Sequence, residues 1–134
     1  MAFAMNTSLF RKNERIVSQK QIDELFSGNG SHSRAAFPVR AIYAVGGRKE
    51  GAVLAQVLVS VPKRRFHHAV DRNRVKRQIR ESYRLNKHIL LEAIPAEKSV
   101  SVAFVWLSDK HLPSAEIEKR VRSLLTHIAQ KINS

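Results

Sequence analysis

A ten-residue stretch, DRNRVKRQIR at 71–80, combines five cationic side chains with one acid and two plainly apolar residues. Arginine forks across two phosphate oxygens, and several cations on one face can neutralise successive phosphates of a nucleic acid. A solvated helix face usually mixes charges of both signs. The stretch therefore predicts a surface that binds a polyanion, with an unusually one-sided solvated face as the alternative.

On a helical wheel this stretch and its continuation separate into two faces. Val75, Ile79 and Ser82, with Tyr83 at their edge, form a face that can pack on a sheet. The adjacent basic arc contains Asn73, Lys76, Arg77, Arg80 and Arg84, with Arg74 further round. Asp71 stands at the helix start, where a carboxylate can cap amides and oppose the helix dipole.

The positive charge of the chain is concentrated in one segment. The 134 residues carry a formal net charge of +13, and residues 63–87 contribute +8 of it, with ten basic residues against two acids. The ten are Lys63, Arg64, Arg65, Arg72, Arg74, Lys76, Arg77, Arg80, Arg84 and Lys87. Charge this local favours a binding surface over general solubility. A membrane-surface helix would need Leu, Trp or Phe on its apolar face, so a nucleic acid is the favoured partner and no membrane is expected.

Composition and motifs exclude several other classes. The chain has no cysteine, which rules out disulfides and fits a reducing compartment. We expect a cytoplasmic protein, because no apolar run approaches the roughly 20 residues of a membrane helix and no signal-peptide pattern is present. No paired acids, Ser-His-Asp set or phosphate-binding glycine loop stands out, so we expect no catalytic residue in this chain. The adjacent His67 and His68 point in different directions, and we expect no metal site.

The hydrophobic pattern predicts a mixed α+β domain. Strands are expected at 37–45, 52–61 and 99–107, the last with apolar residues on both faces and therefore interior. Helices are expected at 19–27, at 69–93 and from about 115, with Ser18 and Ser114 as N-caps. We expect residues 28–33 to be a flexible loop. The first two strands, joined by the Gly-rich turn at 46–51, are expected to pair as an antiparallel hairpin.

These elements predict one domain over residues 15–134, preceded by a flexible basic arm at 1–14. The basic helix lies between two strands, which implies a crossover and a two-layer α+β sandwich with a small central sheet. A helix-turn-helix DNA-binding protein would be mostly helical. The pattern therefore favours an α+β protein that binds RNA, and no DNA is expected.

The longer segment SVPKRRFHHAVDRNRVKRQIRESYR, residues 60–84, resembles the signature of the bacterial ribonuclease P protein family, and the order of elements fits from about residue 11 to 132. The matching residues are Ser60, Val61, Lys63, Arg64, Ala69, Val70, Arg72, Asn73, Arg74, Val75, Lys76, Arg77, Ile79, Arg80 and Glu81. The resemblance implies the protein subunit of an endoribonuclease that removes the 5′ leader from precursor tRNA. It implies that the catalytic RNA, with Mg²⁺ bound mainly to it, performs the hydrolysis. It also implies a left-handed βαβ crossover, in a fold like that of domain 2 of ribosomal protein S5.

The resemblance assigns two groups of site residues. Contacts to the catalytic RNA are expected from Lys63, Arg64, Arg72, Asn73, Arg74, Lys76, Arg77 and Arg80, to which the basic segment adds Arg65 and Arg84. A cleft for the leader of the precursor tRNA is expected between the first helix and the sheet, at Ile22, Phe26, Phe37 and Arg40. Because Ile22 and Arg40 stand where the family often has aromatic residues, we predict a leader held more by charge and less by stacking.

Alternatives remain for the function and for single residues. A structural RNA-binding protein of the ribosomal type would share the basic helix, and a protein-only nuclease would need acids that the sequence does not pair. Phe26 also fits a core residue at helical spacing, and Arg40 also fits an exposed strand position. Tyr83 is expected at the boundary of the core with its hydroxyl outward.

Overall fold

The structure, a computed structural model, describes residues 10, 12–28 and 30–133. Its elements are the 3-10 helix η1 (Lys12–Glu14), α2 (Gln19–Phe26), β1 (Ser31–Ala36), β2 (Val39–Gly47), β3 (Ala55–Ser60), α3 (Ala69–Asn86), α4 (His88–Leu91), β4 (Lys98–Trp106) and α5 (Ser114–Ile132). The strands form one sheet in the order β1-β2-β4-β3. The interior position predicted for the last strand is confirmed.

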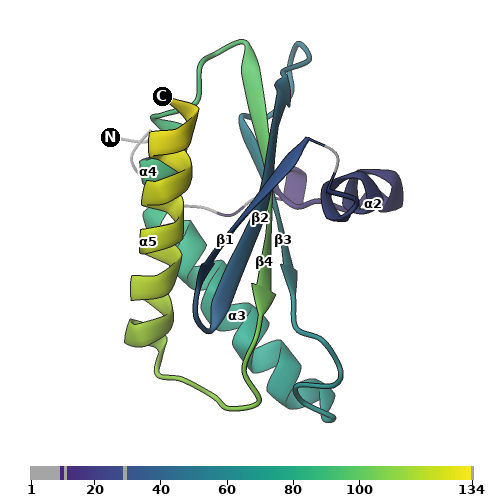
Figure 1. Ribbon diagram of the computed structural model, residues 1–134, viewed down its shortest axis with the longest axis vertical. Helices are drawn as coiled ribbons and strands as arrows, with labels where there is room; N and C mark the ends of the chain where they lie inside the picture. The colour runs from purple at the N-terminus through teal and green to yellow at the C-terminus, as the bar shows by residue number, and fades with distance from the viewer. Residues whose placement is uncertain (1–9, 11, 29, 134) are drawn as a thin grey trace.

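The helices lie on both sides of this sheet, α3 and α5 on one face and α2 on the other (Figure 1). Alternate side chains of each strand point to opposite faces. Val102 and Trp106 of β4 are therefore fully buried under α3 and α5, while Ala103 packs beneath α2. The predicted α+β class is confirmed. The two predicted layers are the sheet and the α3–α5 pair, to which α2 adds a partial cover on the opposite face.

The predicted hairpin between the first two strands is wrong. β2 pairs antiparallel with β1, a strand in the segment that we expected to be a flexible loop, and with β4. The β1 sequence SHSRAA is largely exposed and lacks the alternating apolar pattern by which a strand is recognised. β3 lies beyond β4 and pairs with it in parallel. The β3–α3–β4 connection is therefore the predicted crossover between parallel strands.

Two helix boundaries differ from the prediction. The helix expected at 69–93 consists of α3 and the separate short α4. Ser18 caps α2 as predicted, accepting a hydrogen bond from the Gln21 amide at 3.3 Å. Ser114 is instead the first residue of α5, after Pro113 at the N-cap position. Its Oγ accepts a hydrogen bond from Gln78 Nε2 at 3.1 Å, which ties α5 to α3.

Residues 10 and 12–16, called the N-terminal segment from here on, contact both β3 and the end of α3. Most of the predicted arm at 1–14 lies outside the described residues. Glu14 is buried and accepts a hydrogen bond from Lys87 Nζ at 2.8 Å, just beyond the end of α3. The Ile16 amide donates to the Val57 carbonyl at 3.1 Å, so the segment covers part of the outer edge of β3.

Tyr83 of α3 is fully buried, not at the boundary as expected. Its ring contacts those of Phe10 and Phe104, with centroids 5.4 and 6.2 Å away. Burial raises the pKa of its hydroxyl. That hydroxyl is buried without a hydrogen-bond partner among the described residues.

We therefore predict that Tyr83→Phe leaves the free energy of unfolding unchanged or raises it by about 1 kcal/mol, because the variant removes an unsatisfied polar group and keeps the ring. Tyr83→Leu is the matched control and should lose roughly 0.5–1.5 kcal/mol from the aromatic contacts. Urea denaturation measures both. A loss above about 1 kcal/mol in Tyr83→Phe would mean that the hydroxyl has a partner in solution.

Candidate nucleic-acid interface

The basic side chains of α3 point away from the core because the other face of the helix packs against the sheet. Val75 and Ile79 are fully buried against the sheet, and Ser82 is buried beside them. Residues 73, 77, 80 and 84 recur at helical spacing on the side of the helix roughly opposite this packing face. Asn73 and Arg77 are exposed, while the side chains at 76 and 80 are half-buried. The separation of faces predicted from the helical wheel is confirmed.

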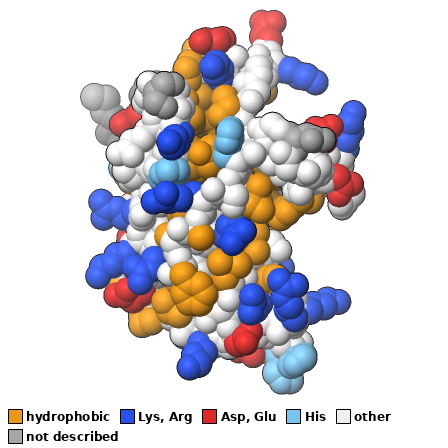
Figure 2. Space-filling model, in the orientation of Figure 1, with side chains coloured by type: hydrophobic (Ala, Val, Ile, Leu, Met, Phe, Trp, Pro, Cys, Tyr) orange, Lys and Arg blue, Asp and Glu red, His pale blue; other side chains and the backbone are white. Residues whose placement is uncertain are grey.

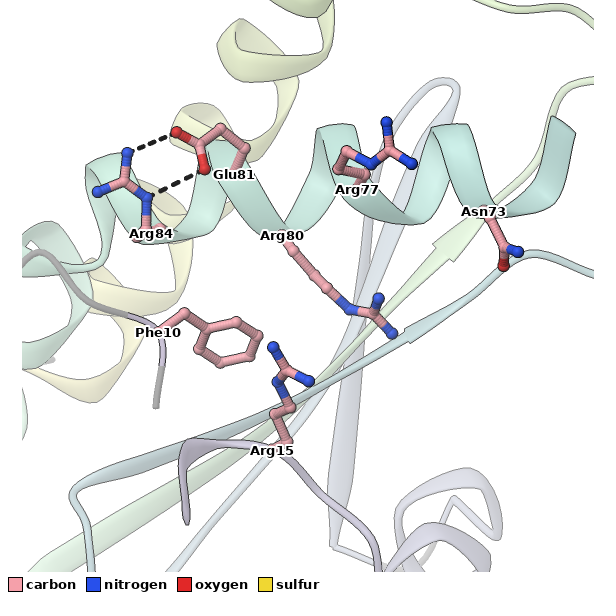
Figure 3. A pocket seen from close by; sticks show the side chains of 7 residues that line it. All are labelled: Phe10, Arg15, Asn73, Arg77, Arg80, Glu81 and Arg84. Carbon is pink, nitrogen blue, oxygen red and sulfur yellow. Dashed lines mark hydrogen bonds and ion pairs between the residues drawn. The ribbon is translucent and has the colours of Figure 1, made fainter. Parts of the chain in front are cut away.

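A groove of about 720 Å³ lies between this face of α3 and the N-terminal segment (Figure 3). The residues that line it are Phe10, Arg15, Asn73, Arg77, Arg80, Glu81 and Arg84. Four guanidinium groups and one carboxylate give the lining a net charge of +3. Figure 3 shows Arg15 and Arg80 directed into the space between the two walls. A concave, positively charged surface of this kind concentrates anions.

The charges in the groove are unevenly compensated. Two hydrogen bonds join Arg84 to Glu81, one of them from Nε to Oε2 at 3.0 Å, and they lower the pKa of the Glu81 carboxyl. Glu81 thus stays ionised and offsets the charge of Arg84. Burial and then the nearby charge of Arg15 lower the pKa of Arg80. The end of the groove at Arg15 and Arg80 is consequently the more positive one.

Phe10 and Arg15 were not among the predicted site residues. The Arg15 guanidinium carbon lies 5.1 Å from the centroid of the Phe10 ring, and that ring meets Tyr83 edge to face. Sequence reasoning missed both residues because they fall in a stretch without helical or strand periodicity. The available signal was an aromatic residue followed at short distance by basic residues, which is too common to identify a site.

Several predicted RNA contacts have structural partners. Arg72 Nη1 donates to the carbonyl oxygens of Phe66 and His67 at 2.8 and 2.9 Å. Arg65 Nη1 lies 3.4 Å from Asp109 Oδ1. Lys87, counted in the basic segment, is buried against Glu14 and adds little to the surface charge. These contacts leave the positive surface smaller than the sequence suggests.

The remaining predicted contacts are accessible. Lys63 and Arg64 are exposed in the loop that follows β3, and Arg74 is exposed on α3. Asp71 lies in the first turn of α3 as predicted, but its Oδ1 is 3.0 Å from His111 Nε2. The N-cap position is His68, which makes no capping hydrogen bond through its side chain. The carboxylate of Asp71 therefore holds the β4–α5 loop to α3.

The four residues of the predicted leader cleft do not form one cluster. Ile22 is a half-buried residue of α2 that packs, like Ile42 of β2, against the small apolar cluster under this helix. Arg40 is exposed two residues from Ile42 on the same strand face. Phe26 is 45% exposed, so it is not a buried core residue. Phe37 is 66% exposed in the turn between β1 and β2, where its carbonyl accepts from Arg120 Nε at 2.9 Å. The structure thus places Arg40 on the sheet face that α2 partly covers, Ile22 on α2 itself, and Phe37 beside α5.

That sheet face is partly open. In Figure 2 hydrophobic side chains lie below α2, with lysines and arginines around them. Beside α2 there is also a cavity of about 140 Å³, lined by Gln21, Glu24, Leu25, Ala44 and Ser101. An apolar surface bordered by cations suits a single-stranded nucleic acid, whose bases are apolar and whose backbone is charged.

Two further properties concern only the described part of the chain. No group of three His, Asp or Glu side chains there is placed to hold a metal ion. None of the helices in residues 12–28 and 30–133 is long and apolar enough to cross a membrane.

The contacts of Arg72 and Arg74 predict different effects on stability. Arg72→Ala should lower the free energy of unfolding by about 1–2 kcal/mol, because two loop carbonyls lose a charged donor. Arg74→Ala, at an exposed position on the same helix, should change it by no more than about 0.5 kcal/mol. Thermal or urea unfolding compares the two variants. Equal effects would contradict a structural role for Arg72.

Comparisons with known proteins agree with this arrangement. The Ribonuclease P family model matches residues 10–129. The ribonuclease P protein component of Porphyromonas gingivalis is 36% identical over 124 residues, which cover 92% of this chain and 88% of the relative. That of Chlorobaculum tepidum is 30% identical over 142 residues and covers 89% of each chain.

Solved structures show the same fold. The RNase P protein from Thermotoga maritima superposes with a TM-score of 0.65 at 19% identity, covering 86% of this chain and 97% of that one. A Staphylococcus aureus RNase P protein mutant with defective mRNA degradation activity gives a TM-score of 0.67 at 20% identity, covering 94% and 96%. The family model and the relatives from Porphyromonas gingivalis and Chlorobaculum tepidum confirm the resemblance carried by residues 60–84: the chain belongs to the ribonuclease P protein family.

Proposed function

We propose that this chain is the protein subunit of ribonuclease P and that it binds the catalytic RNA through the basic face of α3. The observation that carries the proposal is the groove between α3 and the N-terminal segment, with its net charge of +3. Membership of the family supports ribonuclease P RNA as the partner. Phosphate contacts from such a surface provide affinity by releasing counterions from the RNA.

A second surface would bind the 5′ leader of precursor tRNA. The helix α2 offers Ile22, and the sheet face beside it offers Ile42, as apolar contacts, with Arg40 as a cation. Stacking of a base on an aromatic side chain contributes roughly 1–3 kcal/mol, and Ile22 and Arg40 lack an aromatic ring. We therefore propose that electrostatic contacts make the larger contribution to leader binding in this protein, and that Phe26 adds a partly exposed ring at the end of α2.

The hydrolysis itself would be performed by the RNA subunit, with Mg²⁺ bound mainly to that RNA. The protein would contribute binding and electrostatics. Its cations neutralise phosphates that otherwise need magnesium, so less magnesium would be required for activity. Because the leader is present in the precursor and absent from mature tRNA, a leader contact would also favour substrate over product. These partners would place the protein in the cytoplasm.

The test is removal of the 5′ leader from a precursor tRNA at low magnesium concentration, with a bacterial ribonuclease P RNA and this protein, separately and together. We expect cleavage with both components and none with the protein alone. RNA binding without stimulation of cleavage would favour a structural RNA-binding protein. Cleavage by the protein alone would contradict an RNA-based active site.

Arg40→Ala tests the leader surface. We expect the reconstituted enzyme to lose roughly tenfold in affinity for precursor tRNA, the effect of one charge-assisted contact, and to keep its affinity for mature tRNA. Arg122→Ala, at an exposed position of α5, is the matched control. Equilibrium binding of precursor and mature tRNA is measured for each variant. If Arg40→Ala loses the same affinity for precursor tRNA as for mature tRNA, Arg40 does not contact the leader.

A further inference from the structure

Arg15 and Arg80 face one another from opposite walls of the groove. Arg15 belongs to the N-terminal segment and Arg80 to α3, and both side chains point into the same space (Figure 3). Arg15 is close enough for its charge to contribute to the lowered pKa of Arg80, after burial as the larger cause. The fold thus holds the exposed charge of Arg15 close to the half-buried charge of Arg80, which is unfavourable in the free protein.

The nearest acids are directed elsewhere. Glu81 lines the groove, but both of its oxygens accept hydrogen bonds from Arg84. Glu14 precedes Arg15 in the chain, but its side chain is turned into the interior, where it meets Lys87. Among the described residues no carboxylate forms an ion pair with Arg15 or Arg80. The compensating anion must come from outside these residues, from solvent or from a ligand.

The backbone of Arg15 is held in place in the free protein, and the Phe10 ring restricts its exposed side chain. Its amide donates to the Lys12 carbonyl at 3.2 Å, and its backbone bridges to Val57 at the edge of β3. The Phe10 ring lies against its guanidinium and is itself held edge to face by Tyr83. A cation placed in this way loses little conformational freedom on binding, so more of the interaction energy appears as affinity.

We propose that Arg15 and Arg80 bind one phosphate group of the RNA between them, and that Phe10 is a positioning residue that holds Arg15 in place. This inference rests on the proposed function and assigns one particular site within it. Each guanidinium can donate two hydrogen bonds to a phosphate, so two of them surround a single phosphodiester with charge-assisted contacts. The bound phosphate would also relieve the repulsion between the two arginines.

A double-mutant cycle tests whether the two arginines share one phosphate. The dissociation constant for a bacterial ribonuclease P RNA is measured at several salt concentrations for the wild type, Arg15→Ala, Arg80→Ala and the double variant. We expect each single variant to bind roughly tenfold more weakly with little change in the slope of log affinity against log salt, because the remaining arginine still neutralises the phosphate. The double variant should reduce that slope by roughly 0.7–0.9, the value for one phosphate.

Other outcomes would overturn the proposal. If each single variant reduces the slope by roughly 0.7–0.9 and the double variant by twice that amount, the arginines bind separate phosphates. If Arg15→Ala binds like the wild type, Arg15 makes no contact. Phe10→Leu should weaken binding in the wild-type background and have no effect in the Arg15→Ala background; a loss in both would mean that Phe10 acts independently. Arg34→Ala, at an exposed arginine of β1, is the control and should stay within about twofold.

A second measurement separates this site from the proposed function. Inorganic phosphate that binds the folded protein raises its unfolding temperature by mass action. We expect a rise in the wild type that is reduced in each single variant and abolished in the double variant. If this pattern holds while ribonuclease P RNA is neither bound nor activated, the phosphate site stands and the proposed function fails. A rise that persists in the double variant contradicts the phosphate site alone.

Discussion

The packing of one side of α3 against the sheet determines where the positive charge of this protein lies. Val75, Ile79 and Tyr83 are fully buried, so the arginines on the other side of the helix must face outward. This apolar contact offsets the repulsion among cations on a single helix. The β3–α3–β4 connection also anchors α3 at both ends, because the helix lies between two parallel strands of the sheet.

The N-terminal segment converts this convex helix face into a groove. The buried ion pair between Glu14 and Lys87 joins the segment to the end of α3, and the hydrogen bond from Ile16 to Val57 joins it to β3. The chain then continues directly into α2, whose N-cap is Ser18. One short segment therefore connects the charged groove on α3 with the helix that borders the open sheet face. The two proposed RNA surfaces share this structural element.

Periodicity predicted the parts of the molecule whose side chains alternate between core and solvent. The faces of α3, the interior position of β4 and the cap of α2 follow from patterns of this kind. β1 was missed because residues 31–36 are mostly exposed and carry no apolar alternation. Its absence from the prediction made β3 appear to be the partner of β2, although β3 lies beyond β4. The roles of Arg72 and Lys87 could not be predicted either, because their partners are distant in sequence or are backbone carbonyls.

The central claim is that the groove face of α3 contacts ribonuclease P RNA, and directed cleavage of the RNA tests it most directly. The chain has no cysteine, so a hydroxyl-radical source can be tethered at a single site through Asn73→Cys in the groove or Ser123→Cys on the exposed side of α5. We predict strong, localised cleavage of the RNA from position 73 and little from position 123. Equal cleavage from both positions, or stronger cleavage from position 123, would contradict the account.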